Sequence, residues 1–277
     1  MKLKFLFPYW SCESTAPENF IAFCLQHNFD GIEVNFPTDA AQATAFRKAI
    51  TAVRKEKPDF KIMAQQVLSH RTESASAYTE RLLERLNFIL EFEPDSINSL
   101  TGKDSFTFDE NCNIIAAVEA FEQKHGVPIL HEIHRGRFTF HAATLLPYLT
   151  RFPTLKLTGD FSHWCLVSES LLEDQMHHVM KAIPHIHHLH ARVGTEQASQ
   201  ANDPFAPEWK NHVDRFMQLW QTTLDYHIQQ GKTELSITPE FGPFPYMPQS
   251  PFDQKPLGDQ TAINLKMKAL LLNNLNY

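Results

Sequence analysis

The sequence predicts a single (β/α)8 TIM barrel domain that spans residues 1–277. Short runs of strand-forming residues alternate eight times with longer helical patterns, as expected for right-handed βαβ units and a parallel sheet. Eight such units in 277 residues match the usual size of a closed barrel. No Gly-x-Gly-x-x-Gly follows the first strand, which argues against an open, doubly wound sheet.

The strands are expected where short apolar or alternating runs occur. In chain order, they are LKFLF (3–7), GIEVNF (31–36), KIMAQQV (61–67), SINSL (96–100), PILHEIH (128–134), LKLTGDF (155–161), IHHLHARV (186–193) and LSITPEF (235–241). The helices are expected between them, at 17–28, 39–57, 75–93, 110–126, 141–151, 169–182, 208–230 and 259–275. The proline-rich residues 243–257 are too long for an ordinary βα connection, so they predict either a lid or a contact surface.

The last four expected strands each carry one ionisable residue near the C-terminal end. Side chains alternate between the two faces of a strand, so one face of each of these strands can be assigned from its apolar residues. The apolar, outward-facing positions are Ile129, Ile133, Leu155, Leu157, Leu189, Val193, Leu235 and Ile237. The opposite, inward-facing positions include Glu132, Asp160, His190 and Glu240. Barrel enzymes build their active sites at this end of the strands.

A divalent metal ion is the simplest way to hold these four residues together, because unpaired charges inside a barrel are costly. Three carboxylates and an imidazole suit Mn²⁺, Mg²⁺, Co²⁺ or Zn²⁺. Any one of the four residues alone is more often a hydrogen-bonding group at a strand end. Their recurrence in register on four consecutive strands predicts one divalent metal ion bound by Glu132, Asp160, His190 and Glu240.

The motifs HEIHRG, GDFSHW, HLHAR and TPEFG, in this order, resemble the xylose isomerase-like TIM barrel superfamily of sugar phosphate isomerases and epimerases. The resemblance covers essentially the whole chain. It implies that Glu132, Asp160, His190 and Glu240 ligate one metal ion, and His163 completes the family's Asp-x-x-His pattern. It also implies that Glu132 and Glu240 are the catalytic pair that removes and returns a proton.

One branch of this superfamily resembles endonuclease IV and needs three zinc ions, with further histidines from the second and third strands. This chain has Gln65 and Gln66 where the third strand ends, and Asn98 and Ser99 where the fourth ends. None of these side chains is an imidazole or a carboxylate. A three-metal phosphodiesterase site is therefore incomplete.

Substrate contacts are expected from His163, Arg192, His134 and Trp10. His163 follows the sixth strand, and Arg192 lies one layer above the metal histidine, where a guanidinium can hold a substrate oxygen. Ketose epimerases of the family usually carry an arginine six residues after that histidine. This chain has Glu196 there, so Arg192 is the substitute. Trp10 could offer an aromatic face to sugar C–H groups, and core packing explains it equally well.

Three functions remain open. The first is a metal-dependent isomerase or epimerase that acts on a sugar or sugar derivative through an enediolate intermediate. The second is a lyase or dehydratase that acts on a keto-sugar, keto-inositol or oxidised glycoside with the same metal site. The third is a non-catalytic ligand-binding barrel, which the intact ligand set disfavours. No phosphate-binding glycine turn occurs near the last two strands, which favours an unphosphorylated substrate.

Composition limits the partners. The net charge of −7 and a pI near 6.1 argue against nucleic acid as a partner. The four cysteines form no CxxC pair, and no run of about 18 apolar residues occurs, so neither a disulfide framework nor a membrane span is expected. We expect a cytoplasmic protein with a small-molecule sugar substrate. The sequence leaves assembly into a homo-oligomer open.

Overall fold

The computed structural model describes residues 1–277. Its eight strands are parallel and form a closed barrel in the order β1-β2-β3-β4-β5-β6-β7-β8, which confirms the predicted fold class. The strands are β1 (Lys2–Pro8), β2 (Gly31–Val34), β3 (Lys61–Gln66), β4 (Ser96–Ser99), β5 (Ile129–Glu132), β6 (Lys156–Gly159), β7 (Ile186–His190) and β8 (Glu234–Thr238). No helix combines the length and the apolar character needed to cross a membrane.

The chain forms two compact units, which are described separately. The C-terminal unit contains residues 1–5, 133–135 and 139–277, and the N-terminal unit contains residues 6–132 and 136–138. The prediction of one domain over the whole chain stays a prediction.

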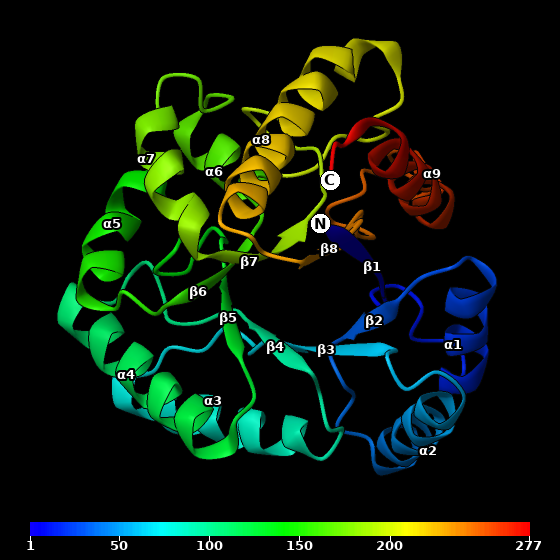
Figure 1. Ribbon diagram of the computed structural model, residues 1–277, viewed down its shortest axis with the longest axis horizontal. Helices are drawn as coiled ribbons and strands as arrows, with labels where there is room; N and C mark the ends of the chain where they lie inside the picture. Colours follow the sequence, from blue (N-terminus) through cyan, green and yellow to red (C-terminus); the bar gives the residue numbers. More distant parts are fainter. The chain divides into compact units, whose positions relative to one another are not determined.

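The N-terminal unit carries four helices and the strands from the end of β1 to β5. The helices are α1 (Pro17–Gln26), α2 (Ala40–Glu56), α3 (Ala75–Leu90) and α4 (Phe108–His125). Helices α1 and α2 pack side by side, as do α3 and α4 (Figure 1). Local sequence explains their bounds: Thr107 and Glu110 form a capping box at the start of α4, and Gly126 ends it with a positive φ.

The C-terminal unit carries β6, β7, β8 and the start of β1. Its helices are α5 (Ala142–Arg151), α6 (Phe161–Ser168), α7 (Met176–Ala182), α8 (Lys210–Gln229) and α9 (Gln260–Asn274), with 3₁₀ turns η1 (Ile183–His185) and η2 (Pro207–Trp209). Helices α5, α7 and α8 flank β6 and β7 (Figure 1). Strand β7 pairs with β8 so that His188 lies beside Ser236 and His190 beside Thr238.

The predicted alternation is present in these strands. Leu157, Leu189 and Ile237 are fully buried apolar residues of one face. The other face carries polar groups that bond across strands: His188 contacts Ser236 Oγ at 2.7 Å through Nδ1 and Thr238 Oγ1 at 3.1 Å through Nε2. His188 is therefore a buried, hydrogen-bonded neighbour of His190.

Helix α6 departs from the expected elements. The sequence predicts a strand up to residue 161 and a helix over 169–182, whereas α6 begins at Phe161 and α7 begins only at Met176. The Asp160 side chain accepts a hydrogen bond from the backbone N–H of Ser162 and so caps a helix immediately after β6. Glu169 adopts a positive φ of 49° and ends that helix.

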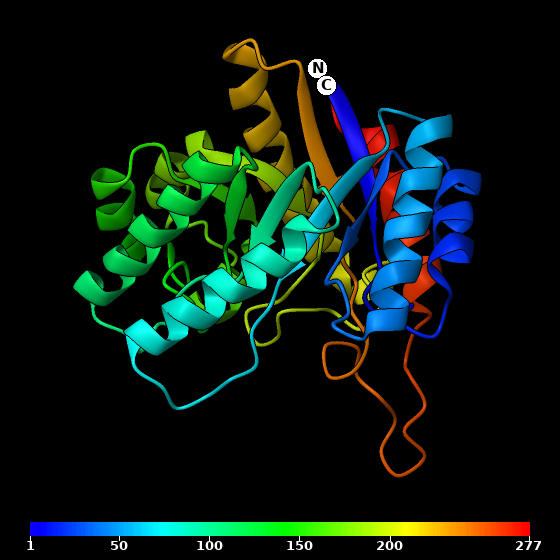
Figure 2. The same cartoon turned by 90° about the horizontal axis from the view of Figure 1, so that it is seen from below.

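The proline-rich segment between β8 and α9 leaves the body of its unit as a long loop (Figure 2). An antiparallel bridge between Gln249 and Pro256 closes its tip, where Phe252 is fully exposed. Its role as a lid or a contact surface stays a prediction.

Candidate active site

Asp160 is the first group of the candidate site. It follows β6, and its side chain is completely buried. Its Oδ1 accepts hydrogen bonds from the backbone N of Ser162 at 3.0 Å and from Ser162 Oγ at 2.5 Å. Its Oδ2 pairs with Arg192 Nη2 and lies 3.7 Å from His163 Nε2. One carboxylate therefore caps a helix with one oxygen and presents the other to the site.

His190 and Glu240 lie on the next two strands. His190 is the last residue of β7, and Glu240 follows the end of β8 by two residues. His190 Nδ1 lies 2.8 Å from Glu240 Oε2, and both side chains are buried. Two of the predicted ligands, from the ends of two neighbouring strands, are thus in direct contact.

Two buried amide side chains hold the backbone just after Glu240. Asn264 of α9 accepts from Phe241 N at 2.8 Å and donates to Phe241 O at 3.2 Å. Gln200 accepts from Gly242 N at 2.8 Å and donates to Gly242 O at 3.1 Å. Each amide satisfies both backbone groups of one residue, so this turn is fixed without regular structure. Sequence reasoning missed both residues, because neither has a motif.

Arg192 joins the two carboxylates. Its Nη2 pairs with Asp160 and lies 3.3 Å from Glu240 Oε2, and its Nε donates to Ser162 Oγ at 3.3 Å. Burial alone lowers the pKa of this guanidinium, but the adjacent carboxylates of Asp160 and Glu240 raise it by more. Arg192 is therefore a fixed cation at the predicted position next to the predicted ligands.

His163 is fully buried in the first turn of α6. Its Nδ1 lies 3.1 Å from Arg135 Nη1, and its Nε2 lies 3.1 Å from Arg192 Nη2. Burial lowers its pKa well below the usual range, and the neighbouring His134, Arg192 and Arg135 lower it further. His163 is consequently a neutral imidazole between two guanidinium groups.

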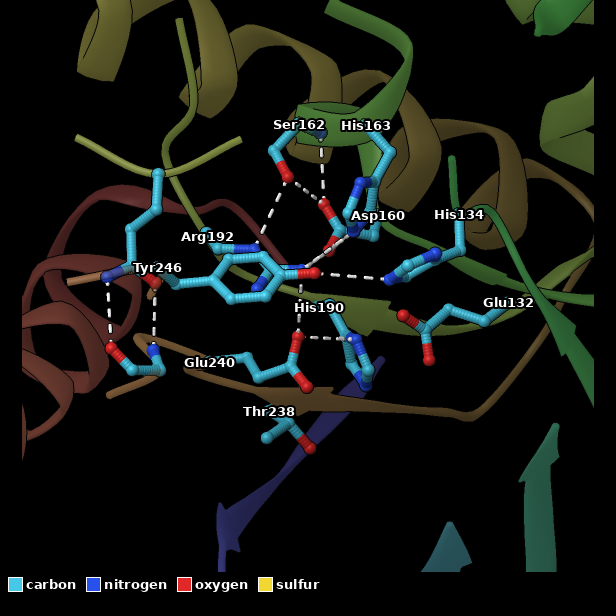
Figure 3. A network of polar contacts seen from close by, with 12 residues as sticks. Glu132, His134, Asp160, Ser162, His163, His190, Arg192, Thr238, Glu240 and Tyr246 are labelled. Carbon is cyan, nitrogen blue, oxygen red and sulfur yellow. Dashed lines mark hydrogen bonds and ion pairs between the residues drawn. The ribbon is translucent and has the colours of Figure 1, made fainter. Parts of the chain in front are cut away.

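Tyr246 comes from the proline-rich loop and reaches the same cluster. Its ring lies under two guanidinium groups, with centroid distances of 4.6 Å to Arg192 and 4.8 Å to Arg135. Its hydroxyl lies 3.2 Å from His134 Nε2, and the rings of His134 and His163 are 3.9 Å apart (Figure 3). The sequence predicts His134, but it marks Tyr246 only as part of a loop of unusual length.

Glu132 belongs to the N-terminal unit. It is the last residue of β5 and is buried, and its Oε2 accepts from Asn98 Nδ2 at 2.7 Å. The same amide donates to Glu33 Oε1 at 3.1 Å, which also accepts from Gln65 Nε2 at 3.1 Å. Asn98 and Gln65 are thus hydrogen-bond donors that orient carboxylates. The assignment of Glu132 as a ligand and base stays a prediction.

Two residues weighed from the sequence have other surroundings. Trp10 lies half-buried in the turn after β1, in the N-terminal unit, and its role with substrate stays a prediction. Glu196 is half-exposed and lies 2.9 Å from His212 Nε2. It provides no substitute for the arginine expected there, whereas Arg192 lies within the cluster.

Asp160, His190 and Glu240 fit a divalent metal ion. One ligand atom from each lies within 4.8 Å of the others, and all three side chains are buried. Two carboxylates and an imidazole suit Mn²⁺, Co²⁺ and Zn²⁺. Arg192 supplies one positive charge against the two carboxylates, so a negative charge remains for a cation to balance.

Comparisons with known proteins agree with the fold. No family model and no curated protein matches the sequence. The structure of IolI with a bound zinc atom has a TM-score of 0.65 and 12% identity over 100% of this chain and 99% of IolI. The probable 3-DHS dehydratase AsbF of Bacillus anthracis, involved in petrobactin synthesis, has a TM-score of 0.63 and 16% identity over 99% of this chain and 100% of AsbF.

A xylose isomerase domain protein from Alicyclobacillus acidocaldarius has a TM-score of 0.62 and 13% identity, with 98% of each chain covered. The chain has the fold of the xylose isomerase-like TIM barrels, as its motifs predict.

Proposed function

We propose that this protein is a metal-dependent isomerase or epimerase that acts on a sugar or sugar derivative. One observation carries the proposal: Asp160, His190 and Glu240, from the C-terminal ends of three consecutive strands, form one buried cluster of metal-ligand type. A buried group of carboxylates is costly without a cation. The likeness of the fold to proteins described as isomerase-type and zinc-bound supports the same function.

The metal ion would be held by Asp160, His190 and Glu240, and we propose Glu132 as the fourth ligand. A bound divalent ion supplies positive charge that stabilises negative charge developing on substrate oxygens. The protein's own groups prepare the site. Ser162 orients Asp160 through two hydrogen bonds, and Asn98 orients Glu132 through one.

The proton transfer is assigned to the two glutamates. Glu240 lies against His190 and Arg192, and we assign one proton transfer to its carboxylate. Glu132 is the partner that acts on the opposite face of the substrate. Arg192 stays charged and holds a substrate oxygen as it becomes an enediolate oxygen. His163 stays neutral, so it can accept one hydrogen bond from a substrate hydroxyl or donate one to it.

A dehydratase or lyase acting on a keto-sugar or related compound is the second candidate, and one contact favours it. The Tyr246 hydroxyl lies 3.2 Å from His134 Nε2, which forms a proton-donating pair beside the proposed metal ligands. Such a pair can protonate a departing hydroxyl group, a step that isomerisation does not need. The similar structure of AsbF, described as a probable dehydratase, agrees with this candidate.

The test is deuterium exchange. Metal-loaded protein is incubated in D₂O with a panel of ketoses, keto-inositols, 3-keto-glycosides and keto-sugar acids, and NMR follows exchange at each carbon. We expect one carbon next to a carbonyl to exchange. Glu240→Gln keeps the shape of the side chain and removes the basic oxygen, so the rate should fall by about 10²–10⁴-fold.

Metal content is measured in the same samples, and Glu208→Gln on the exposed turn η2 is the matched control. Glu208→Gln should exchange at the wild-type rate. Wild-type exchange in a fully metallated Glu240→Gln variant contradicts the assignment of this residue. Absence of exchange with every compound, at full metal content, contradicts the proposed reaction class.

A further inference from the structure

Two arginines converge on Tyr246 and His163 in the C-terminal unit. The guanidinium groups of Arg135 and Arg192 both lie within 5 Å of the centre of the Tyr246 ring, at 4.8 and 4.6 Å. Each also approaches one nitrogen of His163 at 3.1 Å. Figure 3 shows the Tyr246 ring in front of Arg192, with its hydroxyl directed to His134. Two cations therefore share the same two partners.

This cluster has more hydrogen-bond donors than acceptors. An imidazole has at most one acceptor nitrogen whatever its protonation state, so His163 can accept from Arg135 or from Arg192 but not from both. Arg192 Nη1 is buried and has no hydrogen-bond partner. A buried donor without an acceptor is destabilising. The missing acceptors are the kind of atoms that a bound ligand provides.

The charges of the two arginines are balanced differently. Arg192 pairs with the carboxylates of Asp160 and Glu240. Arg135 contacts the His163 ring and the Tyr246 ring, and it forms no ion pair with a carboxylate. The guanidinium of Arg135 is thus a cation without a carboxylate in direct contact, beside the cluster of ligand-type residues. A ligand group with a single negative charge and two acceptor oxygens matches it.

We propose that the substrate carries a carboxylate, and that Arg135 recognises this group with the help of Arg192 Nη1. The substrate class is then a sugar acid or a keto-sugar acid, and not a neutral sugar or a sugar phosphate. This inference rests on the proposed function, because it names the substrate of the same site. Arg135 acts as a specificity residue: it selects the acid and takes no part in the proton transfer.

Binding of three matched compounds tests the inference. D-Gluconate, D-glucitol and D-glucitol 1-phosphate share the carbon chain and differ only at C1, which is a carboxylate, a hydroxymethyl group or a phosphorylated hydroxymethyl group. Calorimetry with the metal-loaded protein at constant ionic strength measures each Kd. We expect D-gluconate to bind at least about tenfold more tightly than D-glucitol, the factor expected for one charge-assisted hydrogen bond.

Arg135→Gln should abolish that preference, and Arg135→Lys, which keeps the charge and loses the planar fork, should retain part of it. Arg151→Gln, at the exposed end of α5, removes the same charge elsewhere and should behave as wild type. Metal content is measured in every sample. If D-gluconate binds directly to the metal ion instead of to Arg135, the Arg135→Gln variant will retain the preference.

Three results would overturn the inference. They are equal wild-type affinities for D-gluconate and D-glucitol, tighter binding of D-glucitol 1-phosphate, and an undiminished preference in Arg135→Gln. The first two need no variant, so a misfolded Arg135→Gln does not leave the question open. The proposed function is tested separately. If the protein prefers D-gluconate but no compound of the ketone panel exchanges deuterium, the inferred ligand class stands and the proposed reaction is wrong.

Discussion

At the residue scale, Asp160 shows how one side chain can serve the fold and the site together. Its Oδ1 accepts from Ser162 and begins α6, while its Oδ2 faces Arg192 and His163. These two duties are separable by substitution. Asparagine keeps the carbonyl oxygen that caps the helix, and it removes the negative charge that a metal ion needs.

We therefore predict that Asp160→Asn folds but loses the metal ion. Loss of an outer hydrogen bond typically weakens metal affinity by about 10–100-fold, so loss of a charged ligand should weaken it by more than about 100-fold. Elemental analysis of protein purified without chelator, with circular dichroism on the same sample, is the measurement. His190→Gln should behave likewise.

The control is Asp225→Asn, which removes the same charge from the exposed face of α8. It should retain the metal content of the wild type. If Asp160→Asn and His190→Gln both retain it as well, the ligand assignment is wrong.

The strand-end residues of the candidate site are predictable from the sequence because strand geometry repeats every two residues. That period places Asp160, His190, Arg192 and Glu240 on one side, opposite apolar positions that are buried in the structure. Tyr246 is different, because no period applies to a loop. The backbone upstream of it is held by Gln200 and Asn264 through long-range contacts that no local pattern encodes.

At the scale of elements, the loop between β8 and α9 divides into two parts. The part near β8 carries Tyr246 into the cluster, where its hydroxyl meets His134. The distal part is a bridged tip with exposed Phe252. The sequence predicts a lid or a contact surface here, and the position of Tyr246 suits a wall of the candidate site.

The start of α6 was harder to predict, because an apolar run after a strand resembles a continuation of that strand until a capping residue is recognised.

The hydroxyl of Tyr246 distinguishes the two candidate reactions. We predict that Tyr246→Phe leaves deuterium exchange unchanged, because the ring still packs against Arg135 and Arg192. On a substrate with a leaving group β to the carbonyl, the same variant should lose about 10²–10⁴-fold in elimination, the usual contribution of a general acid. NMR in D₂O measures exchange and elimination in one sample.

Tyr226→Phe on α8 is the matched control and should change neither rate. Equal losses in exchange and elimination would assign the Tyr246 hydroxyl to substrate binding. Elimination at the wild-type rate in Tyr246→Phe would exclude it as the proton donor, and the dehydratase candidate would lose its supporting contact.

At the scale of the whole molecule, the fold class follows from eight repeats of one pattern, which is why it is predictable without any recognised motif. The division into two compact units is not predictable in this way. One boundary lies within β1, and the other lies in the connection after β5. Neither carries a change in composition or a linker, because both lie inside regular βα repeats.

The stability of the fold should depend on pH through His227 of α8. This buried residue donates from Nε2 to the backbone oxygen of Ile186, the first residue of β7, at 2.6 Å. Burial lowers its pKa to about 4, with a further contribution from the charge of Lys232. An unfolded chain has a histidine pKa near 6.5. Between these values the unfolded state binds the proton and the folded state does not.

Stability should therefore be fully present above pH of about 6.5 and should be lost as pH falls toward 4, because the proton drives unfolding. His227→Gln keeps an N–H donor for Ile186 and removes the titration. Denaturant unfolding at pH 7, 5.5 and 4.5 should show the wild type losing on the order of 1–3 kcal/mol more than His227→Gln across this range. The comparison uses the change in stability with pH, so a constant effect of the substitution cancels.

The control is His70→Gln, which replaces an exposed histidine and should follow the wild type. If wild type and His227→Gln lose stability in parallel, the proton is not taken up at this position, and acid sensitivity must come from other groups.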